Sequence, residues 1–120
     1  MDLALTFATI GPCAVLHCDG RIVSGPQADC LVRRCSQIFE SYPALGLQLS
    51  GVTTLDSGGA GTLVRILNTA RKQGKELTII SPSEKVMRVL ESTNLNSVFT
   101  IYTSVEEFFT PPLKRAAATA

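Results

Sequence analysis

A large net charge of either sign is missing from this sequence, and its absence narrows the choice of partners. Eleven lysine and arginine residues stand against ten aspartate and glutamate residues, which leaves a net charge of +1. A nucleic-acid-binding domain usually gathers an excess of basic charge on one face. We therefore predict that nucleic acid is not a partner of this chain.

Long apolar runs are also missing. No stretch approaches the roughly 20 apolar residues that a membrane-spanning helix requires. The opening residues, MDLALTFATIGP, carry an acid at position 2 and no basic cluster, and their apolar stretch stops at Gly11 and Pro12. This pattern is not that of a secretory signal. We expect a cytoplasmic protein with no direct membrane insertion.

Motifs for catalysis and for cofactors are scarce. His17 is the only histidine, and a lone histidine on a strand is more often structural than catalytic. No G-K-[ST] follows the glycines of LDSGGAG at 55–61, and a dinucleotide fingerprint starting at Gly59 would need a glycine where Val64 stands. Ser57 has no glycine two residues before it, as a nucleophile elbow requires. We predict that the protein is not an enzyme and holds no cofactor.

The four cysteines do not form a metal or redox motif. Cys13 and Cys18 lie five residues apart, as do Cys30 and Cys35. On a strand this offset places the two thiols on opposite faces, and on a helix it places them about 140° apart. Zinc sites normally use closer spacings. We predict four buried or half-buried free thiols and no metal site.

Strand and helix patterns alternate along the chain and predict a single α/β domain with a mixed sheet. The first two strands are joined by Gly11 and Pro12, which favours an antiparallel hairpin. About four helices follow, the first with its apolar stripe running from Ala28 to Tyr42. The last is expected after Thr103 or Ser104. Strands are predicted at 3–10, 13–19, 45–52, 76–80 and 98–102.

Two helix starts carry capping signals. The sequence SPSE at 81–84 fits a capping box with Ser81 as the N-cap. Asp56 is predicted to cap the second helix by accepting a hydrogen bond from the amide of Gly58 or Gly59. This role does not account for the three glycines at 58, 59 and 61, each of which costs a helix about 1 kcal/mol relative to alanine. They either allow close backbone packing or leave a bare surface for a partner.

The segment LQLSGVTTLDSGGAGTLVRIL at 47–67 resembles the signature of STAS domains of the bacterial anti-sigma-factor antagonist type. The resemblance extends to GRIVSG at 20–25 and to VFTIYTSVEEFF at 98–109. It implies an STAS fold for residues 1–110. Residues 111–120 begin with two prolines and continue with LKRAAATA, which has no apolar stripe, and we expect them to form a flexible tail.

The resemblance also implies a function. Such proteins are non-enzymatic modules that bind an anti-sigma factor, a serine kinase of the histidine-kinase-like ATPase type, and so control sigma-factor-dependent transcription by partner switching. A serine phosphatase is a second partner of some of these switches. The implied docking surface comprises the 20–25 loop, the glycine-rich turn and the exposed side of the second helix, namely Ser24, Asp56, Ser57, Gly58, Gly59, Ala60, Gly61 and Arg65.

This chain departs from the family pattern at the position that is usually phosphorylated, where Gly58 offers no hydroxyl. Ser57 is the alternative phosphoacceptor, although one residue along a helix turns the side chain by about 100°. A protein without the acceptor is either a constitutive binder or part of another assembly. We expect Gly58→Glu to weaken partner capture and to leave thermal stability nearly unchanged.

Two other functions fit the same resemblance. STAS domains also serve as cytoplasmic accessory subunits of membrane transporters for lipids or anions, in which a missing phosphoacceptor has less consequence. The other alternative is a nucleotide-binding STAS module. Co-purification with a transporter ATPase would indicate the transporter subunit, and a thermal shift with GTP or ATP would indicate the nucleotide-binding module.

Overall fold

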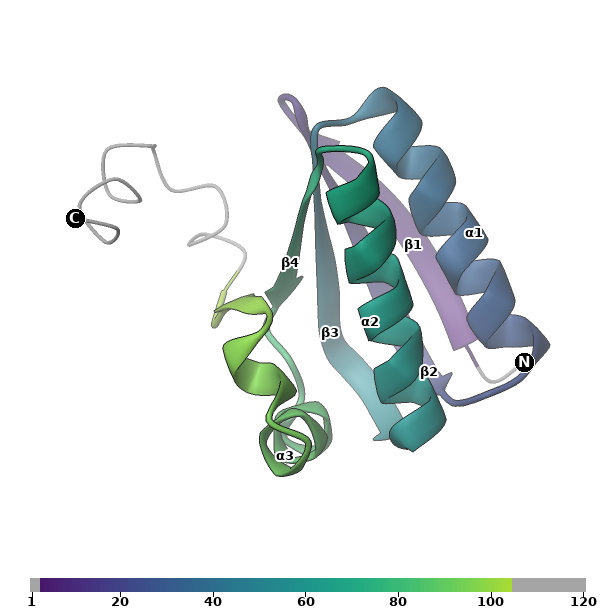
Figure 1. The fold of residues 1–120 in the computed structure, drawn as a ribbon, viewed down its shortest axis with the longest axis vertical. Helices are drawn as coiled ribbons and strands as arrows, with labels where there is room; N and C mark the ends of the chain where they lie inside the picture. Colours follow the sequence, from purple (N-terminus) through teal and green to yellow (C-terminus); the bar gives the residue numbers. More distant parts are fainter. Residues whose placement is uncertain (1–2, 105–120) are drawn as a thin grey trace.

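The computed structural model describes residues 3–104, and within them it confirms the predicted α/β fold (Figure 1). Three α-helices and a short 3-10 helix, η1, connect five strands in the described residues. The fourth α-helix predicted after Thr103 or Ser104 lies outside them, as does the tail. The elements in chain order are β1 Leu3–Ile10, β2 Cys13–Ile22, α1 Pro26–Ser41, β3 Ala44–Leu55, α2 Ser57–Lys72, β4 Glu76–Ile80, α3 Glu84–Ser92, η1 Leu95–Ser97 and β5 Thr100–Tyr102.

The five strands form one mixed sheet in the order β1-β2-β3-β4-β5. β1 and β2 pair antiparallel around Gly11, whose φ of 58° is a left-handed conformation that glycine adopts without strain. The pairs β2 with β3, β3 with β4 and β4 with β5 are all parallel. The predicted hairpin is therefore confirmed, and the parallel strands all end at one edge of the sheet.

Helices α1 and α2 lie side by side over one face of the sheet (Figure 1). The predicted stripe of α1 faces the sheet, since Ala28, Leu31, Cys35, Ile38 and Phe39 are all buried. Because α1 follows β2 and α2 follows β3, both helices begin at the edge where the parallel strands end, at the bottom of Figure 1. This topology brings the two helix N-termini together.

The predicted N-cap of the third helix was wrong. Ser81 has a φ of 48°, its amide donates to the carbonyl of Tyr102 over 2.8 Å and its hydroxyl donates to the carbonyl of Thr103 over 3.0 Å. These bonds hold Ser81 against the end of β5. The helix therefore starts two residues later, where Ser83 Oγ accepts a hydrogen bond from the amide of Val86 over 3.3 Å.

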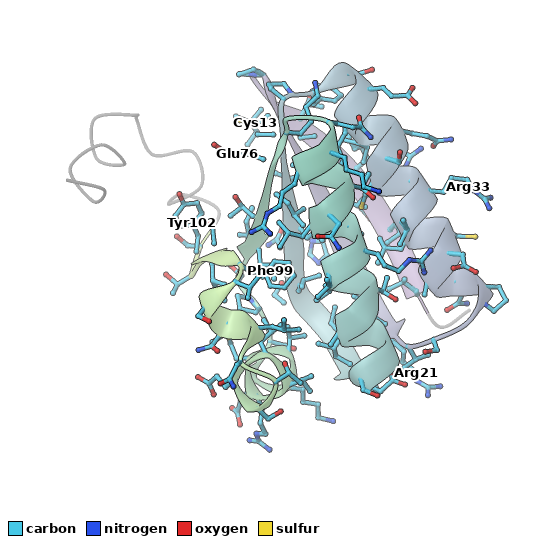
Figure 2. The ribbon with its side chains drawn as sticks, in the orientation of Figure 1. Cys13, Arg21, Arg33, Glu76, Phe99 and Tyr102 are labelled. Atoms are coloured by element: carbon cyan, nitrogen blue, oxygen red, sulfur yellow. The ribbon has the colours of Figure 1, made fainter. Side chains whose placement is uncertain are left out.

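The last strand is shorter than the sequence predicted. β5 comprises only Thr100–Tyr102, because residues 95–97 form η1 and the amide of Phe99 still bonds to the carbonyl of Leu95 over 3.2 Å. The side chain of Phe99, labelled in Figure 2, is buried in the main core. Burial of this ring accounts for the apolar character of the segment, which sequence analysis assigned to a strand.

Candidate functional site

The start of α2 is fixed by Asp56, as the sequence predicted. The carboxylate oxygen Oδ1 of Asp56 accepts a hydrogen bond from the amide of Gly59 over 2.7 Å, and the carbonyl of Asp56 accepts one from the amide of Ala60 over 2.9 Å. A negative charge at this point also interacts favourably with the helix dipole. Asp56 thus satisfies amides that would otherwise have no partner in the helix.

Close packing accounts for Gly59, one of the three glycines. A Cβ added at Gly59 would overlap the backbone carbonyl oxygen of Ile22 and would lie 2.7 Å from Leu55 Cδ1. The obstacle is backbone, which cannot rotate out of the way. Gly59 is therefore required for close packing of the α2 N-terminus on the end of β2.

Gly58 faces a different neighbour. A Cβ added at Gly58 would overlap the hydroxyl oxygen of Ser24 and would lie 2.9 Å from Ser24 Cβ and 3.3 Å from the Ser24 amide nitrogen. The Ser24 side chain, from the loop between β2 and α1, occupies the space that a residue-58 side chain would need. A side chain at position 58 requires this loop to shift, so the expectation that Gly58→Glu leaves stability unchanged does not fit the structure.

Gly61 is the one glycine of the three with open space around its Cα. A Cβ added there would meet no heavy atom within 4 Å, and the residue is exposed in the second turn of α2. Gly61 therefore serves no packing purpose among the described residues. It leaves bare helix backbone at the surface.

A pocket of about 300 Å³ lies where α1 and α2 begin. An ion pair closes one side of it, with Arg65 Nη1 3.1 Å from Asp29 Oδ1; the two side chains are 56% and 60% exposed. Arg21, labelled in Figure 2, lies near the C-terminal end of β2 and so at the same edge of the sheet as the starts of α1 and α2. The lining residues are Ser24, Gly25, Ala28, Asp29, Gly58, Gly61, Thr62 and Arg65.

The pocket brings together four of the eight residues predicted for the docking surface, namely Ser24, Gly58, Gly61 and Arg65. Asp56 and Ser57 are exposed and do not line the pocket, whereas Gly59 and Ala60 are buried and do not line it either. Sequence analysis missed Asp29, the partner of Arg65. It lies 36 residues from Arg65, and no local pattern connects the two.

The histidine and the four cysteines, which sequence analysis considered as catalytic or metal-binding groups, lie outside the pocket. His17 Nε2 lies 3.2 Å from Asp19 Oδ1, on a side chain that is 36% exposed. The four cysteines are free thiols, and Cys13, Cys18 and Cys35 are buried or partly buried as predicted, but the prediction was wrong for Cys30, which is exposed. Residues 3–104 contain no group of three histidine, cysteine or acidic side chains close enough to hold a metal ion. Burial, followed by the negative charge of Asp19, raises the pKa of the Cys18 thiol to about 12. Burial likewise raises the pKa of Cys35.

Comparisons with known proteins agree with the resemblance seen in the sequence. The family model described as "STAS domain" matches residues 4–108. A protein of Thermotoga maritima that carries the provisional name anti-sigma factor antagonist is 38% identical over 68 residues, which cover 57% of this chain and 60% of that relative. The match thus spans less than two thirds of the relative.

No helix in the described part of the chain has the length and apolar character needed to cross a membrane.

Solved structures have the same fold. A crystal structure of a provisionally named anti-sigma factor antagonist from Thermotoga maritima superposes with a TM-score of 0.77 at 26% identity, covering 88% of this chain and 91% of that one. The anti-sigma factor antagonist SpoIIAA in its unphosphorylated form gives 0.73 at 16% identity, covering 88% and 93%. The phosphorylated form of SpoIIAA, from Bacillus, gives 0.67 at 13% identity, covering 88% and 96%.

Proposed function

This chain belongs to the STAS domain family, and we propose that it is a non-enzymatic binding module of the anti-sigma factor antagonist type. Its proposed partner is an anti-sigma factor that has a histidine-kinase-like ATPase domain with serine kinase activity. Binding of that partner would release a sigma factor for transcription. The names of the relatives and solved structures support this assignment, and the geometry at the start of α2 supports the location of the docking surface.

The observation that carries the proposal is the bare surface at Gly61. A glycine in the second turn of a helix weakens that helix by about 1 kcal/mol relative to alanine. Gly59 offsets this cost by allowing close packing, but Gly61 has nothing to pack against in the described residues. A partner that approaches the helix backbone closely at this point explains why no side chain is present.

The surroundings of Gly61 suit a protein partner. The pocket is concave, with small residues such as Gly25, Ala28 and Gly58 on its surface. Arg65 and Asp29 stand at its rim, more than half exposed. Exposed charged groups of this kind can set the orientation of a protein partner, and the small residues allow that partner to approach the backbone closely.

The lack of a hydroxyl at position 58 has a direct consequence for regulation. A phosphoryl group cannot be attached at Gly58, so this position of the docking surface stays permanently unmodified. If the surface is regulated by phosphorylation, another hydroxyl must accept the phosphate. A serine phosphatase would be a second partner in that case.

The test is a pull-down from the lysate of the native organism with three forms of the full chain. Gly61→Glu adds bulk and charge to the pocket. Its Cβ would meet no heavy atom within 4 Å, and Arg65 four residues later is a favourable partner for the new carboxylate. Gln37→Glu adds the same charge at an exposed position of α1 and is the matched control. Thermal unfolding of all three proteins checks that the variants are folded.

We expect the wild type and Gln37→Glu to retain a histidine-kinase-like ATPase, identified by mass spectrometry, and Gly61→Glu to lose it. Retention of that ATPase by Gly61→Glu would place the docking surface elsewhere. Capture of a transporter ATPase subunit in place of an anti-sigma factor would contradict the proposed function and favour the transporter alternative.

A further inference from the structure

The hydroxyl of Ser24 lies beside position 58, where this chain has no hydroxyl of its own. A Cβ added at Gly58 would overlap Ser24 Oγ, so the loop between β2 and α1 places a hydroxyl oxygen in the space that a side chain at position 58 would need. The two residues belong to segments that are far apart in the sequence. The surface at the start of α2 therefore carries a serine hydroxyl, although it belongs to another segment of the chain.

The Ser24 hydroxyl is accessible and has no assigned structural role. Ser24 is exposed, and within the described residues its hydroxyl takes part in no hydrogen bond. Ser57 is also exposed, but it does not line the pocket, whereas Ser24 does. Of the two serines on the proposed docking surface, Ser24 alone lines the pocket.

The charges around Ser24 can accommodate a phosphate. Arg65 lines the same pocket, and its guanidinium is the kind of group that pairs with a phosphate through two hydrogen bonds. Asp29 opposes a second negative charge in the pocket, but its carboxylate is already paired with Arg65. A phosphate on Ser24 would compete with Asp29 for Arg65, and so would alter the charge pattern at the rim of the docking surface.

We propose that Ser24 is the phosphoacceptor of this chain, an inference that rests on the proposed function. The kinase partner transfers the γ-phosphoryl group of ATP to Ser24. A bond forms between Ser24 Oγ and the γ-phosphorus, the bond from that phosphorus to the bridging oxygen of ADP breaks, and the hydroxyl proton leaves to a base of the kinase or to water. The product carries about 1.5 to 2 additional negative charges in the pocket, which would prevent docking.

The sequence makes the site simple to assign. Trypsin cleaves after Arg21 and Arg33, and the resulting peptide, IVSGPQADCLVR at 22–33, contains Ser24 as its only hydroxyl-bearing residue. The full chain is incubated with Mg²⁺, ATP and the ATPase that it captures, and the tryptic peptides are examined by mass spectrometry. Wild type, Ser24→Ala and Ser57→Ala are compared.

We expect a phosphate on peptide 22–33 of the wild type and of Ser57→Ala, and none on Ser24→Ala. Phosphate on the peptide that contains Ser57, with peptide 22–33 unmodified, would overturn the proposal. Capture of the ATPase without any phosphorylation would overturn it as well, while leaving the proposed docking function intact. Failure to capture such an ATPase would refute the proposed function, and the Ser24 proposal with it.

A swapped variant separates a specific acceptor from accidental phosphorylation of an exposed serine. Ser24→Gly combined with Gly58→Ser removes the side chain that obstructs position 58 and places a hydroxyl there. If the kinase reads the place of the hydroxyl at the start of α2, phosphate moves from peptide 22–33 to the hydroxyl introduced at position 58. A swapped variant that is folded and captures the ATPase but stays unphosphorylated would overturn the claim that Ser24 takes the place of a hydroxyl at position 58, because phosphorylation would then depend on the loop around residue 24 alone.

Discussion

Ser24 Oγ occupies space that the Cβ of residue 58 would need if Gly58 were any other amino acid. This relationship joins the loop between β2 and α1 to the N-terminus of α2, two segments that are far apart in the sequence. It explains the glycine at 58 by packing, and it shows that a hydroxyl is still present at the start of α2. A side chain at 58 and a side chain at 24 exclude one another in this arrangement.

Because side chains at positions 24 and 58 exclude one another, we predict that substitutions at these two positions have strongly coupled effects on the free energy of unfolding. Gly58→Ser alone should destabilise the chain, by about 1 to 3 kcal/mol as expected for overpacking, because Ser24 must move. With Ser24→Gly in the background, the same change should cost much less. Urea unfolding of the two single variants and the double variant gives the coupling energy, expected at about 0.5 to 3 kcal/mol in favour of the double variant. Additive effects would contradict this prediction, because they would show that the Ser24 side chain moves aside with no loss of stability.

Gly59 and Gly61 should respond in opposite directions to the same substitution. Gly59→Ala places a Cβ on the carbonyl oxygen of Ile22 and should lower the unfolding free energy by about 1 to 3 kcal/mol. Gly61→Ala meets no atom within 4 Å and should raise it by up to about 1 kcal/mol, since alanine favours the helix. Midpoints of chemical denaturation compare the two variants, and a loss of stability in both would contradict the open environment of Gly61.

The capping bond of Asp56 should be measurable on its own. Asp56→Ala removes the 2.7 Å hydrogen bond from the Gly59 amide and should destabilise the chain by about 0.5 to 2 kcal/mol. Asp56→Asn keeps an oxygen in the same place and should retain most of the stability, losing mainly the charge interaction with the helix dipole. Thermal denaturation of both variants tests this order. Equal losses would mean that the charge, and not the hydrogen bond, stabilises the helix start.

The four thiols should divide into two reactivity classes. Cys30 is exposed and Cys13 is partly exposed, whereas Cys18 and Cys35 are buried. Since the thiolate is the reactive form, a raised pKa and poor access together protect the buried pair. Alkylation of the native protein at mildly alkaline pH, followed by intact-mass analysis, should modify two thiols readily and the other two only after denaturation. Rapid alkylation of all four would contradict the described core.

The same burial predicts a loss of stability at alkaline pH. The pKa of Cys18 rises from an ordinary value of 9.0 to about 12 on folding, so between these values the unfolded chain gives up a proton that the folded chain keeps. The stabilising effect is complete below about pH 9 and is lost as the pH rises toward about 12. Each buried thiol should lower the unfolding free energy by about 1.4 kcal/mol per pH unit in this range. Cys18→Ala should show a shallower slope over the same range in denaturation experiments.

Features determined by neighbouring residues could be predicted from the sequence. The hairpin at Gly11, the buried stripe of α1 and the Asp56 cap depend on local spacing and on side chains within a few residues, and all three are confirmed. The α3 N-cap depended on a distant contact. Ser81 fits a capping box locally, but its bonds to Tyr102 and Thr103 in the β5 segment decide where the helix starts.

The candidate site shows the same division. The glycine-rich turn pointed to the start of α2, and four of the predicted residues do line one pocket. The different roles of Gly58, Gly59 and Gly61 follow from what lies opposite each of them, namely the Ser24 side chain, the Ile22 carbonyl and open space. No spacing within 55–61 contains that information, because the neighbours of Gly58 and Gly59 come from β2 and its following loop.

The affinity of the purified chain for the ATPase that it captures tests the central claim most directly, measured for wild type, Gly61→Glu and Gln37→Glu. A docking surface at the start of α2 predicts that Gly61→Glu binds at least about tenfold more weakly, equivalent to about 1.4 kcal/mol, while Gln37→Glu binds as the wild type does. All three proteins should unfold at similar temperatures. Equal affinities for the three proteins would contradict the account, because they would show that the partner does not contact the pocket where α1 and α2 begin.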